Sequence, residues 1–370
     1  MSSAFAGVLV LWIAVAAVYR FVALRSLARL CDPGGGPADP VPPDGEVAVL
    51  RPLHGAPAGF ESCLESLLRA AAPARARVVL GVESRGDPAA RSAERVAARV
   101  HEARAELRIA AGPAGPNRKV ANLIQMAGGL EAELLLLSDA DVRVPRDYVA
   151  RATRAFKDSD VGLVTGPYRS VPAPSVASRL DALVTNTHFL PSACFAARFE
   201  GVHFGLGASI AVRGEALARA GGFEALLPLA ADDYGLARNV EAAGYRLAWT
   251  PMMVEHVLED DGWRRSLRRH LRWARVVRSQ RPLGYVGQLA VQGPLPVLLL
   301  AALWLSSGGP GGLVPLGWWA AQLAEVWRCR ASLALRARDL ALLPAADLLA
   351  ILVWAGGLVG SPQPPDAEHR

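Results

Sequence analysis

The chain has 370 residues, of which 52% are hydrophobic and 20% are charged, so it is more apolar than an ordinary soluble enzyme. Its formal net charge of +6 rests mostly on arginine beside apolar segments, which favours an anionic membrane face over nucleic acid as a partner. The four cysteines form no CxxC pair, and the sequence has neither zinc-finger spacing nor a long basic tail. The composition therefore argues against a zinc-finger protein, a disulfide scaffold and a nucleic-acid-binding protein.

Apolar segments at both ends of the chain predict membrane spans. Residues 4–24 are almost free of polar groups before Arg20, and about twenty such residues suffice to cross a bilayer. This segment lacks a basic first region and a cleavage site, so we interpret it as an anchor and not as a signal peptide. Three further apolar stretches follow near the other end, at 285–306, 311–327 and 340–360. The second is short and contains Gln322 and Glu325, so it either spans the membrane or re-enters it.

Arginine placement predicts the orientation of these spans. Arginines follow the first span and lie between the third and the fourth, namely Arg20, Arg25, Arg29, Arg328, Arg330, Arg336 and Arg338. Because basic residues near spans stay on the cytoplasmic side, the central region is expected to be cytoplasmic. Four spans would then leave both termini outside.

The central region alternates between short apolar runs and helical stretches. After a Pro/Gly-rich linker, the apolar runs suited to buried strands are 47–53, 76–82, 107–111 and 134–137. The helical stretches between them are 60–72, 89–105 and 119–130. This alternation predicts an α/β domain with a mostly parallel sheet, whose ligands bind beyond the carboxyl ends of the strands.

Two aspartates follow the last of these predicted strands. Asp139 and Asp141 are two residues apart, so their side chains lie on the same side of an extended chain. Carboxylate oxygens suit Mg²⁺ or Mn²⁺, and a bound diphosphate would complete the metal's ligands. The alternative is a pair of turn or helix-cap aspartates, because a helix is expected soon after Pro145. Together with the other motifs, the pattern favours a metal site.

A second carboxylate pair, Asp232 and Asp233, opens a predicted helix over 234–243. Acids at a helix start can simply cap it and complement its dipole. Two adjacent acids exceed what a cap needs, and a carboxylate near a bound alcohol can act as a general base. We expect Asp233 to be the base and Asp232 to support it.

A basic amphipathic helix is predicted over 263–281. Its arginines could lie on anionic lipid headgroups. The planar guanidinium of Arg272 also suits a diphosphate, and the two roles are compatible.

Three smaller features have weaker signals. Asn117 and Lys119 follow a Gly/Pro turn and begin a helix, which suits a phosphate or nucleotide but also fits a solvated helix start. The Gly205-Leu206-Gly207 string is a weak phosphate loop, because a strand follows it. Histidines without ligand spacing are interpreted as structural, namely His188, His203 and His256.

In their order along the chain, these motifs resemble the ceramide glucosyltransferase family of membrane-bound, GT-A-fold glycosyltransferases, which is family 21. The resemblance runs from about residue 47 to residue 285. Its strings are Arg51-Pro-Leu-His-Gly55, Gly86-Asp-Pro-Ala89, Asn117-Arg-Lys-Val-Ala-Asn122, Ser138-Asp-Ala-Asp-Val-Arg-Val144, Gly162-Leu-Val164, Gly221-Gly-Phe223, Asp232-Asp-Tyr234 and Arg269-His-Leu-Arg-Trp273.

The resemblance implies roles for several residues. The family has a nucleotide-binding aspartate, a metal-site aspartate, a base aspartate and a (Q/R)xxRW string. These correspond here to Asp87, Asp141 with Asp139, Asp233, and the set Arg269, Arg272 and Trp273. The chain departs from the family at the first position, where only Glu83 and Asp87 are available and the family often has several acids.

Two segments resemble a bacterial branch of the family. Residues 204–212 with Gly221-Gly-Phe223, and residues 272–285, are similar to hopanoid-biosynthesis-associated glycosyltransferases. Those enzymes are implied to add N-acetylglucosamine to a hopanoid polyol. The resemblance implies a multi-pass protein of the bacterial inner membrane.

The sequence thus predicts an α/β GT-A (nucleotide-diphospho-sugar transferase) domain with N-terminal and C-terminal transmembrane helices. The expected parts are an anchor (1–30), a linker (31–45), a cytoplasmic GT-A domain (46–281), a transmembrane region (282–360) and a tail (361–370). The expected reaction is inverting transfer of glucose or N-acetylglucosamine from a UDP-sugar to a hydroxyl of ceramide or a hopanoid polyol, with Mg²⁺ or Mn²⁺.

Two alternatives to this reaction stay open. One is a processive polysaccharide synthase, although the QxxRW string of those enzymes begins with Gln where this chain has Arg269. The other is a non-catalytic membrane scaffold that binds nucleotide-sugars.

Overall fold

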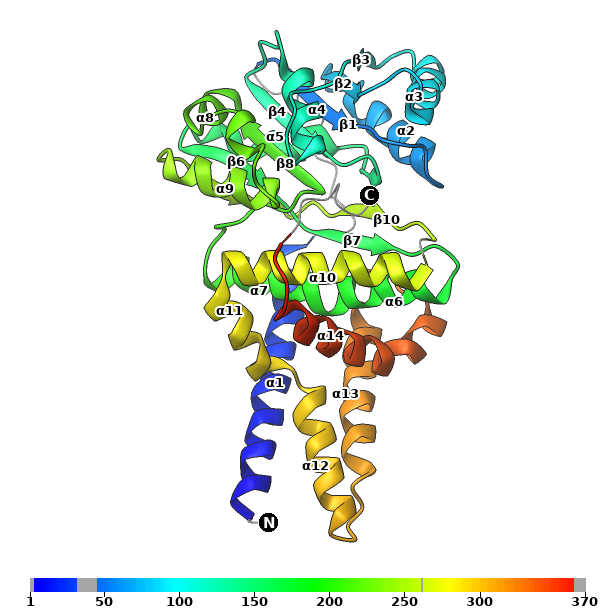
Figure 1. Ribbon diagram of the computed structural model, residues 1–370, viewed down its shortest axis with the longest axis vertical. Helices are drawn as coiled ribbons and strands as arrows, with labels where there is room; N and C mark the ends of the chain where they lie inside the picture. The colour runs from blue at the N-terminus through cyan, green and yellow to red at the C-terminus, as the bar shows by residue number, and fades with distance from the viewer. Residues whose placement is uncertain (1–2, 32–44, 261, 363–370) are drawn as a thin grey trace. The chain divides into compact units, whose positions relative to one another are not determined.

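The computed structural model describes residues 3–31, 45–260 and 262–362 (Figure 1). The chain folds into two compact units. The sheet unit comprises Leu30–Val171 and Ala196–Glu259, and the helical unit comprises Met1–Arg29, Pro172–Phe195 and Asp260–Pro362. Nearly all of the predicted linker (31–45) and most of the predicted tail (361–370) lie outside the described residues.

A seven-stranded sheet forms the centre of the sheet unit. Its strands are β1 (Val47–Pro52), β2 (Arg77–Val82), β3 (Arg104–Ile109), β4 (Leu134–Ser138), β6 (Val161–Thr165), β8 (Ser209–Arg213) and β9 (Arg246–Trp249). Their order is β3-β2-β1-β4-β8-β6-β9. The first four are mutually parallel, whereas β8 runs antiparallel to β4 and β6. A three-stranded sheet contains β5 (Val142–Arg143), β7 (Tyr168–Val171) and β10 (Val254–Val257), in the order β5-β10-β7. The predicted α/β class is confirmed.

Helices connect the strands of the sheet unit. They are α2 (Phe60–Ala71), α3 (Pro88–Arg99), α4 (Arg118–Ala127), α5 (Tyr148–Thr153), α8 (Gly214–Arg219) and α9 (Asp232–Ala242), with short 3₁₀ turns η1 (Arg154–Lys157) and η3 (Glu224–Leu226). The apolar face of α4 buries Val120, Leu123 and Met126 in a core that also contains Leu50 of β1 and Val212 of β8. Burial of this face fixes the start of α4, with its polar residues, at the carboxyl end of the parallel strands.

One predicted boundary is wrong. The helix expected over 89–105 ends at Arg99, and strand β3 begins at Arg104. This strand lies at the edge of the sheet and alternates charged with apolar residues. A search for apolar runs therefore misses its first half, because an edge strand does not need to be apolar on both faces.

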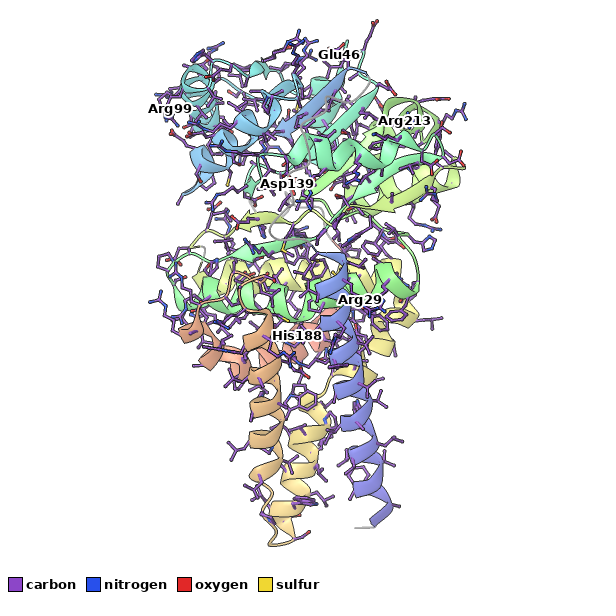
Figure 2. The ribbon with its side chains drawn as sticks, turned by 180° about the vertical axis from the view of Figure 1, so that it is seen from behind. Arg29, Glu46, Arg99, Asp139, His188 and Arg213 are labelled. Atoms are coloured by element: carbon purple, nitrogen blue, oxygen red, sulfur yellow. The ribbon has the colours of Figure 1, made fainter. Side chains whose placement is uncertain are left out.

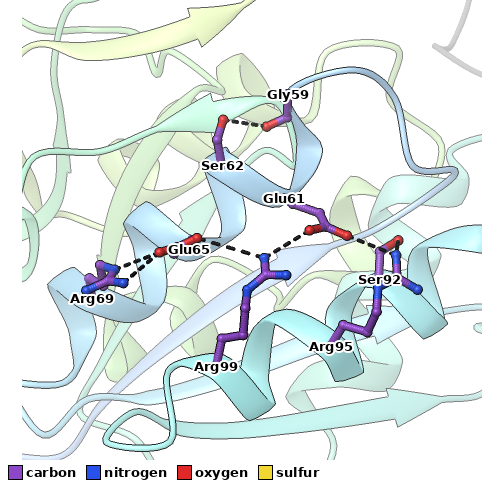
Figure 3. Close-up of polar contacts among 8 residues, drawn as sticks. All are labelled: Gly59, Glu61, Ser62, Glu65, Arg69, Ser92, Arg95 and Arg99. Atoms are coloured by element: carbon purple, nitrogen blue, oxygen red, sulfur yellow. Dashed lines mark hydrogen bonds and ion pairs between the residues drawn. The ribbon is translucent and has the colours of Figure 1, made fainter.

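An exposed charge network joins α2 and α3 (Figure 3). Glu61 accepts hydrogen bonds from Arg95 and Arg99, each at 2.9 Å. Glu65 accepts two from Arg69, at 2.7 and 2.9 Å, within α2. Because water screens such pairs and their long side chains lose entropy on pairing, this network contributes little to stability.

The helical unit contains the apolar helices. Its elements are α1 (Ser3–Leu30), α6 (Val176–Val184), η2 (Thr185–Phe189), α7 (Leu190–Phe199), α10 (Gly262–Gln280), α11 (Pro282–Gly287), η4 (Gln288–Val291), α12 (Pro294–Ser306), α13 (Leu313–Cys329), η5 (Ala337–Leu342) and α14 (Leu343–Gly357). Figure 1 shows α12 and α13 side by side, and α14 alongside α6 and α10.

Fewer helices than expected have the length of a membrane span. Among the described residues, Ala4–Leu30 and Ala337–Gly357 are long and apolar enough. Pro282–Val291 and Pro294–Ser306 would add a third span only as one segment bent by 41°. Helix α13 covers the stretch expected at 311–327, but it has 17 residues and falls short of that length.

A buried carboxylate fastens α10 to α6. Asp181 of α6 is 0% exposed, and it accepts hydrogen bonds from Ser266 Oγ at 2.6 Å, Arg269 Nη2 at 2.5 Å and His270 Nε2 at 3.0 Å. Burial by itself raises the pKa of Asp181, but the bonds from His270 and Arg269 outweigh it and hold that pKa well below its usual range. The string Arg269-His270 is therefore part of the packing of α10.

Replacing Asp181 with Asn tests this anchor. The variant keeps the side-chain shape but leaves the partly buried Arg269 without its counter-charge, which is expected to cost about 3–5 kcal/mol. Thermal unfolding of the detergent-purified chain should show a melting temperature several degrees lower. The exposed-network control Glu61→Gln should melt like the wild type, and equal melting temperatures for all three proteins would contradict the anchor.

Candidate active site

The carboxyl end of β4 positions the first pair of acids. Strand β4 is wholly buried and pairs with β8 through Ser138 and Ser209, so the chain leaves the sheet directly at Asp139. Asp141 follows in the turn that leads into β5. Figure 2 shows Asp139 at the end of the sheet opposite to Glu46, which precedes β1. The acids therefore lie where parallel sheets bind ligands.

A buried arginine holds this turn in place. Arg51 of β1 is 0% exposed and donates to Ser138 Oγ and to the carbonyl oxygen of Val142, both at 2.8 Å. A third bond reaches the carbonyl oxygen of Cys63 at 2.9 Å. Since Ser138 and Val142 flank the two aspartates, Arg51 fixes the turn that presents them. The sequence motifs assigned no role to Arg51. A cation inside an apolar strand nevertheless indicates that its side chain has buried hydrogen-bond partners.

Lys119 joins the two pairs of acids. Its Nζ lies 2.7 Å from Asp139 Oδ1 and 3.2 Å from Asp232 Oδ2. Although burial lowers the pKa of Lys119, the charges of Asp139 and Asp232 outweigh it and raise that pKa well above its usual range. A permanently charged ammonium group therefore bridges the end of β4 and the start of α9.

Asn117, predicted to bind the nucleotide with Lys119, makes its hydrogen bonds within the protein. It is 0% exposed, its Oδ1 caps α4 by accepting from the Val120 N–H at 3.2 Å, and its Nδ2 donates to the Leu229 carbonyl oxygen at 3.1 Å. The cap fixes the first turn of α4, which carries Lys119.

Asp233 is held by backbone groups. Its Oδ2 accepts from the Gly207 N–H at 3.0 Å, and its Oδ1 accepts from the Tyr234 N–H at 2.8 Å. A Cβ at Gly207 would lie 3.1 Å from Asp233 Oδ2, and one at Gly205 would lie 2.6 Å from the Asp233 carbonyl oxygen. Both glycines are needed for this approach, so the string read as a weak phosphate loop instead orients a carboxylate.

The two adjacent carboxylates differ in their affinity for a proton. Burial and the charge of Asp232 raise the pKa of Asp233 to about 6. Burial also raises the pKa of Asp232, but Lys119 outweighs it and holds that pKa below its usual range. Asp232 therefore stays ionised, while Asp233 has the affinity for a proton that a general base needs near neutral pH.

The second aspartate of β4 has a histidine partner. Asp141 lies 3.2 Å from His256 Nε2, and the His256 ring in turn contacts Ser170 Oγ at 3.3 Å. Burial raises the pKa of Asp141, but His256 outweighs it and lowers that pKa. Burial also raises the pKa of Asp139. His256, which the sequence analysis interpreted as structural, thus contacts Asp141, a predicted metal ligand. The position of His256 along the chain did not reveal this contact.

The donor set fits a hard divalent cation. Among the described residues, no group of three or more His, Cys, Asp or Glu side chains is placed to hold a metal. The Asp139 and Asp141 side chains are 35% and 41% exposed, so their oxygens remain accessible. Mg²⁺ and Mn²⁺ commonly take one or two carboxylates and complete their ligands with substrate phosphates and water.

The predicted nucleotide contacts have partners of their own. Asp87 caps α3 by accepting from the Ala89 N–H at 2.8 Å, and it also accepts from the Gly55 N–H at 2.9 Å. Glu83 forms an ion pair with Arg118. Both acids follow β2, at the same sheet edge as Asp139, and nucleotide binding by them stays a prediction.

The remaining predicted site residues lie on α10 in the helical unit. Arg269 pairs with Asp181, as described above. The ring of Trp273 packs edge-on against His270, with 5.5 Å between ring centroids. Catalytic roles for Arg269, Arg272 and Trp273 stay predictions.

The chain resembles glycosyltransferases in fold as well as in motifs. A mannosyltransferase from Pyrobaculum calidifontis, solved in complex with GDP-Man and Mn²⁺, superposes with a TM-score of 0.54 at 18% identity, covering 94% of this chain and 97% of that chain. Glucosyl-3-phosphoglycerate synthase from Mycobacterium tuberculosis is more distant, with a TM-score of 0.41 at 16% identity over 67% of this chain and 86% of that chain.

The family itself follows from a match that covers nearly the whole chain. The sequence model of the family described as "Glycosyl transferase family 21" matches residues 8–362, which includes both pairs of acids and the apolar helices at either end. The protein is therefore a glycosyltransferase that belongs to family 21.

Proposed function

We propose that this enzyme transfers glucose or N-acetylglucosamine from a UDP-sugar to a hydroxyl group of a membrane lipid, with inversion at the anomeric carbon. The observation that supports it is the cluster in which Lys119 bridges Asp139 and Asp232 and leaves Asp233 with a raised pKa. The apolar helices of the helical unit support a lipid as the acceptor. Arginine placement supports a cytoplasmic GT-A domain, and the resemblance to hopanoid-biosynthesis-associated glycosyltransferases supports a bacterial inner membrane.

The donor would bind at the end of β4. Asp139 and Asp141 would hold Mg²⁺ or Mn²⁺, which when bound supplies positive charge to the diphosphate leaving group. Lys119 brings a second cation to the same place, 2.7 Å from Asp139. Arg272 is proposed as a further donor to the diphosphate.

The acceptor would be activated by Asp233. Its carboxylate removes the proton from the lipid hydroxyl while that oxygen attacks the anomeric carbon, and UDP departs from the opposite face. The Gly207 and Tyr234 N–H groups orient the carboxylate, and the neighbouring charge of Asp232 raises its pKa. Positioning of the two reactants and charge stabilisation of the leaving group together lower the barrier.

Replacing Asp233 with Asn tests the base. Loss of a general base is expected to lower the rate of transfer by about 10²–10⁴-fold. UDP binding should persist, because the amide preserves the shape. Product is measured by mass spectrometry of glycolipids formed from UDP-glucose or UDP-N-acetylglucosamine, and UDP binding is measured by calorimetry with Mn²⁺.

The exposed control Asp160→Asn should behave as wild type. Normal turnover by Asp233→Asn would remove the base assignment, and a polymeric product would indicate a processive synthase.

The pH dependence of kcat/KM follows from the raised pKa of Asp233. A base must be deprotonated to accept a proton, so activity should be full above the pKa of about 6 and fall about tenfold per pH unit below it. Activity is assayed between pH 4.5 and 8, and aliquots are returned to pH 7.5 to exclude denaturation. A rate that stays constant down to pH 5 would contradict this role.

Metal removal tests the two aspartates of β4. Chelation with EDTA should abolish transfer, and added Mn²⁺ or Mg²⁺ should restore it. The Asp141→Asn variant should need at least about tenfold more Mn²⁺ for half-maximal activity, because it loses one charged ligand. The Asp160→Asn control should show the wild-type requirement. Full activity in EDTA would exclude a metal-dependent reaction.

A further inference from the structure

The helical unit contains a cavity of about 230 Å³ that the proposed chemistry leaves unused. Its wall is formed by residues of α1, α6, η2, α7, α10, α11, η4, α13 and α14, together with residues 292–294 at the start of α12. Most of the lining is apolar and includes Leu24, Val184, Phe189, Val291, Val353 and Trp354. An apolar cavity with a few polar groups is the usual form of a small-molecule site.

Three polar groups on this wall are buried and lack hydrogen-bond partners. They are Thr185 Oγ1, Trp318 Nε1 and Arg20 Nη2. Native proteins pair nearly all buried polar groups, because an unpaired donor loses its bonds to water without replacement. Three unpaired groups on one cavity wall indicate a ligand that supplies the missing partners.

The backbone around Thr185 is unusual in the same place. Residues Thr185–Phe189 form a π-helical turn, a rare conformation that occurs frequently at functional sites. Thr187 also lines the cavity, but its hydroxyl donates to the Leu183 carbonyl oxygen at 2.7 Å. Thr185 makes no such bond, so its buried hydroxyl has no hydrogen-bond partner in the protein.

The other two groups are held in place by neighbours. A Cβ at Gly293 would collide with the six-membered ring of Trp318, so the ring packs directly on the backbone there. Arg20 Nε donates to Glu325 at 2.9 Å, which fixes the guanidinium and neutralises its charge. A neutralised arginine favours a neutral polar head over a diphosphate.

We propose that this cavity binds polar groups of the hydroxylated lipid that accepts the sugar, other than the hydroxyl that reacts at Asp233. Trp318 and Arg20 donate hydrogen bonds to oxygen atoms of these groups, Thr185 exchanges one with a further hydroxyl, and the apolar lining covers the adjoining methylene groups. The volume is below the ~300–1,000 Å³ of pockets that hold whole ligands, so the rest of the lipid extends along the apolar helices. The inference rests on the proposed function, since a lipid acceptor is part of it.

Lipid binding by the full chain in detergent tests the inference without sugar transfer. Equilibrium binding of two probes, a fluorescent C6 ceramide and a fluorescent hydroxylated triterpenoid, is measured in the absence of UDP-sugar. The wild type should bind at least one probe. Thr185→Val and Trp318→Phe each remove one hydrogen-bonding group and keep the shape, so each should weaken binding about fivefold.

Two matched variants serve as controls. Thr187→Val lies on the same wall, but its hydroxyl is already bonded within the helix, and Trp304→Phe changes an exposed indole of α12. Both should bind the probe as wild type does. In the transfer assay, Thr185→Val and Trp318→Phe should raise the KM for lipid about fivefold and leave the KM for UDP-sugar unchanged.

The inference is overturned if the wild type binds neither probe, or if Thr185→Val and Trp318→Phe both melt and bind as the wild type does. Metal-dependent hydrolysis of UDP-sugar by the wild type is measured separately. If hydrolysis and transfer are both absent while the two variants lose lipid binding, the proposed function fails and the cavity is still a lipid site.

Discussion

The ammonium group of Lys119, held between Asp139 and Asp232, is the interaction on which the rest of the site depends. Four carboxylates at one edge of a sheet repel one another, and the partly buried Lys119 cation lets them stay together. The cation comes from the first turn of α4, which the buried Asn117 cap fixes in place. The core beneath α4 thus determines where the charge lies.

The Lys119 bridge also gives the acids different roles. Asp232 takes the lysine as its partner and stays ionised, whereas Asp233 receives only backbone N–H groups and has a raised pKa. Two adjacent identical side chains can therefore differ in proton affinity, because their immediate partners differ. On the other side of the lysine, Asp139 and Asp141 keep accessible oxygens for a metal.

Much of the sheet unit could be predicted from sequence, because apolar strands and amphipathic helices alternate with clear turns. The first half of the edge strand β3 could not, since its polar alternation resembles the end of a helix. The strings around Asp139 and Asp232 identified the acids but not their mutual contacts. The two strings are linked through Lys119, which lies 20 residues before Asp139 and 113 before Asp232, and periodicity reports only neighbours along one element.

Buried ionic partners were the least predictable feature. Arg51 and Asp181 stand inside apolar stretches, and neither belongs to a catalytic string by its own chemistry. Their roles depend on partners from other elements, such as the carbonyl of Val142 for Arg51 and the guanidinium of Arg269 for Asp181. The same limitation applies to the cavity of the helical unit, whose unpaired groups come from three separate helical segments.

A structure of the complex with Mn²⁺ and an intact, non-transferable UDP-sugar analogue tests the central claim most directly. We expect a diphosphate bound by metal on Asp139 and Asp141, with Lys119 beside it and the Asp233 carboxylate facing the anomeric carbon from the side opposite UDP. A diphosphate bound elsewhere, or a sugar whose open face is turned away from Asp233, would contradict it.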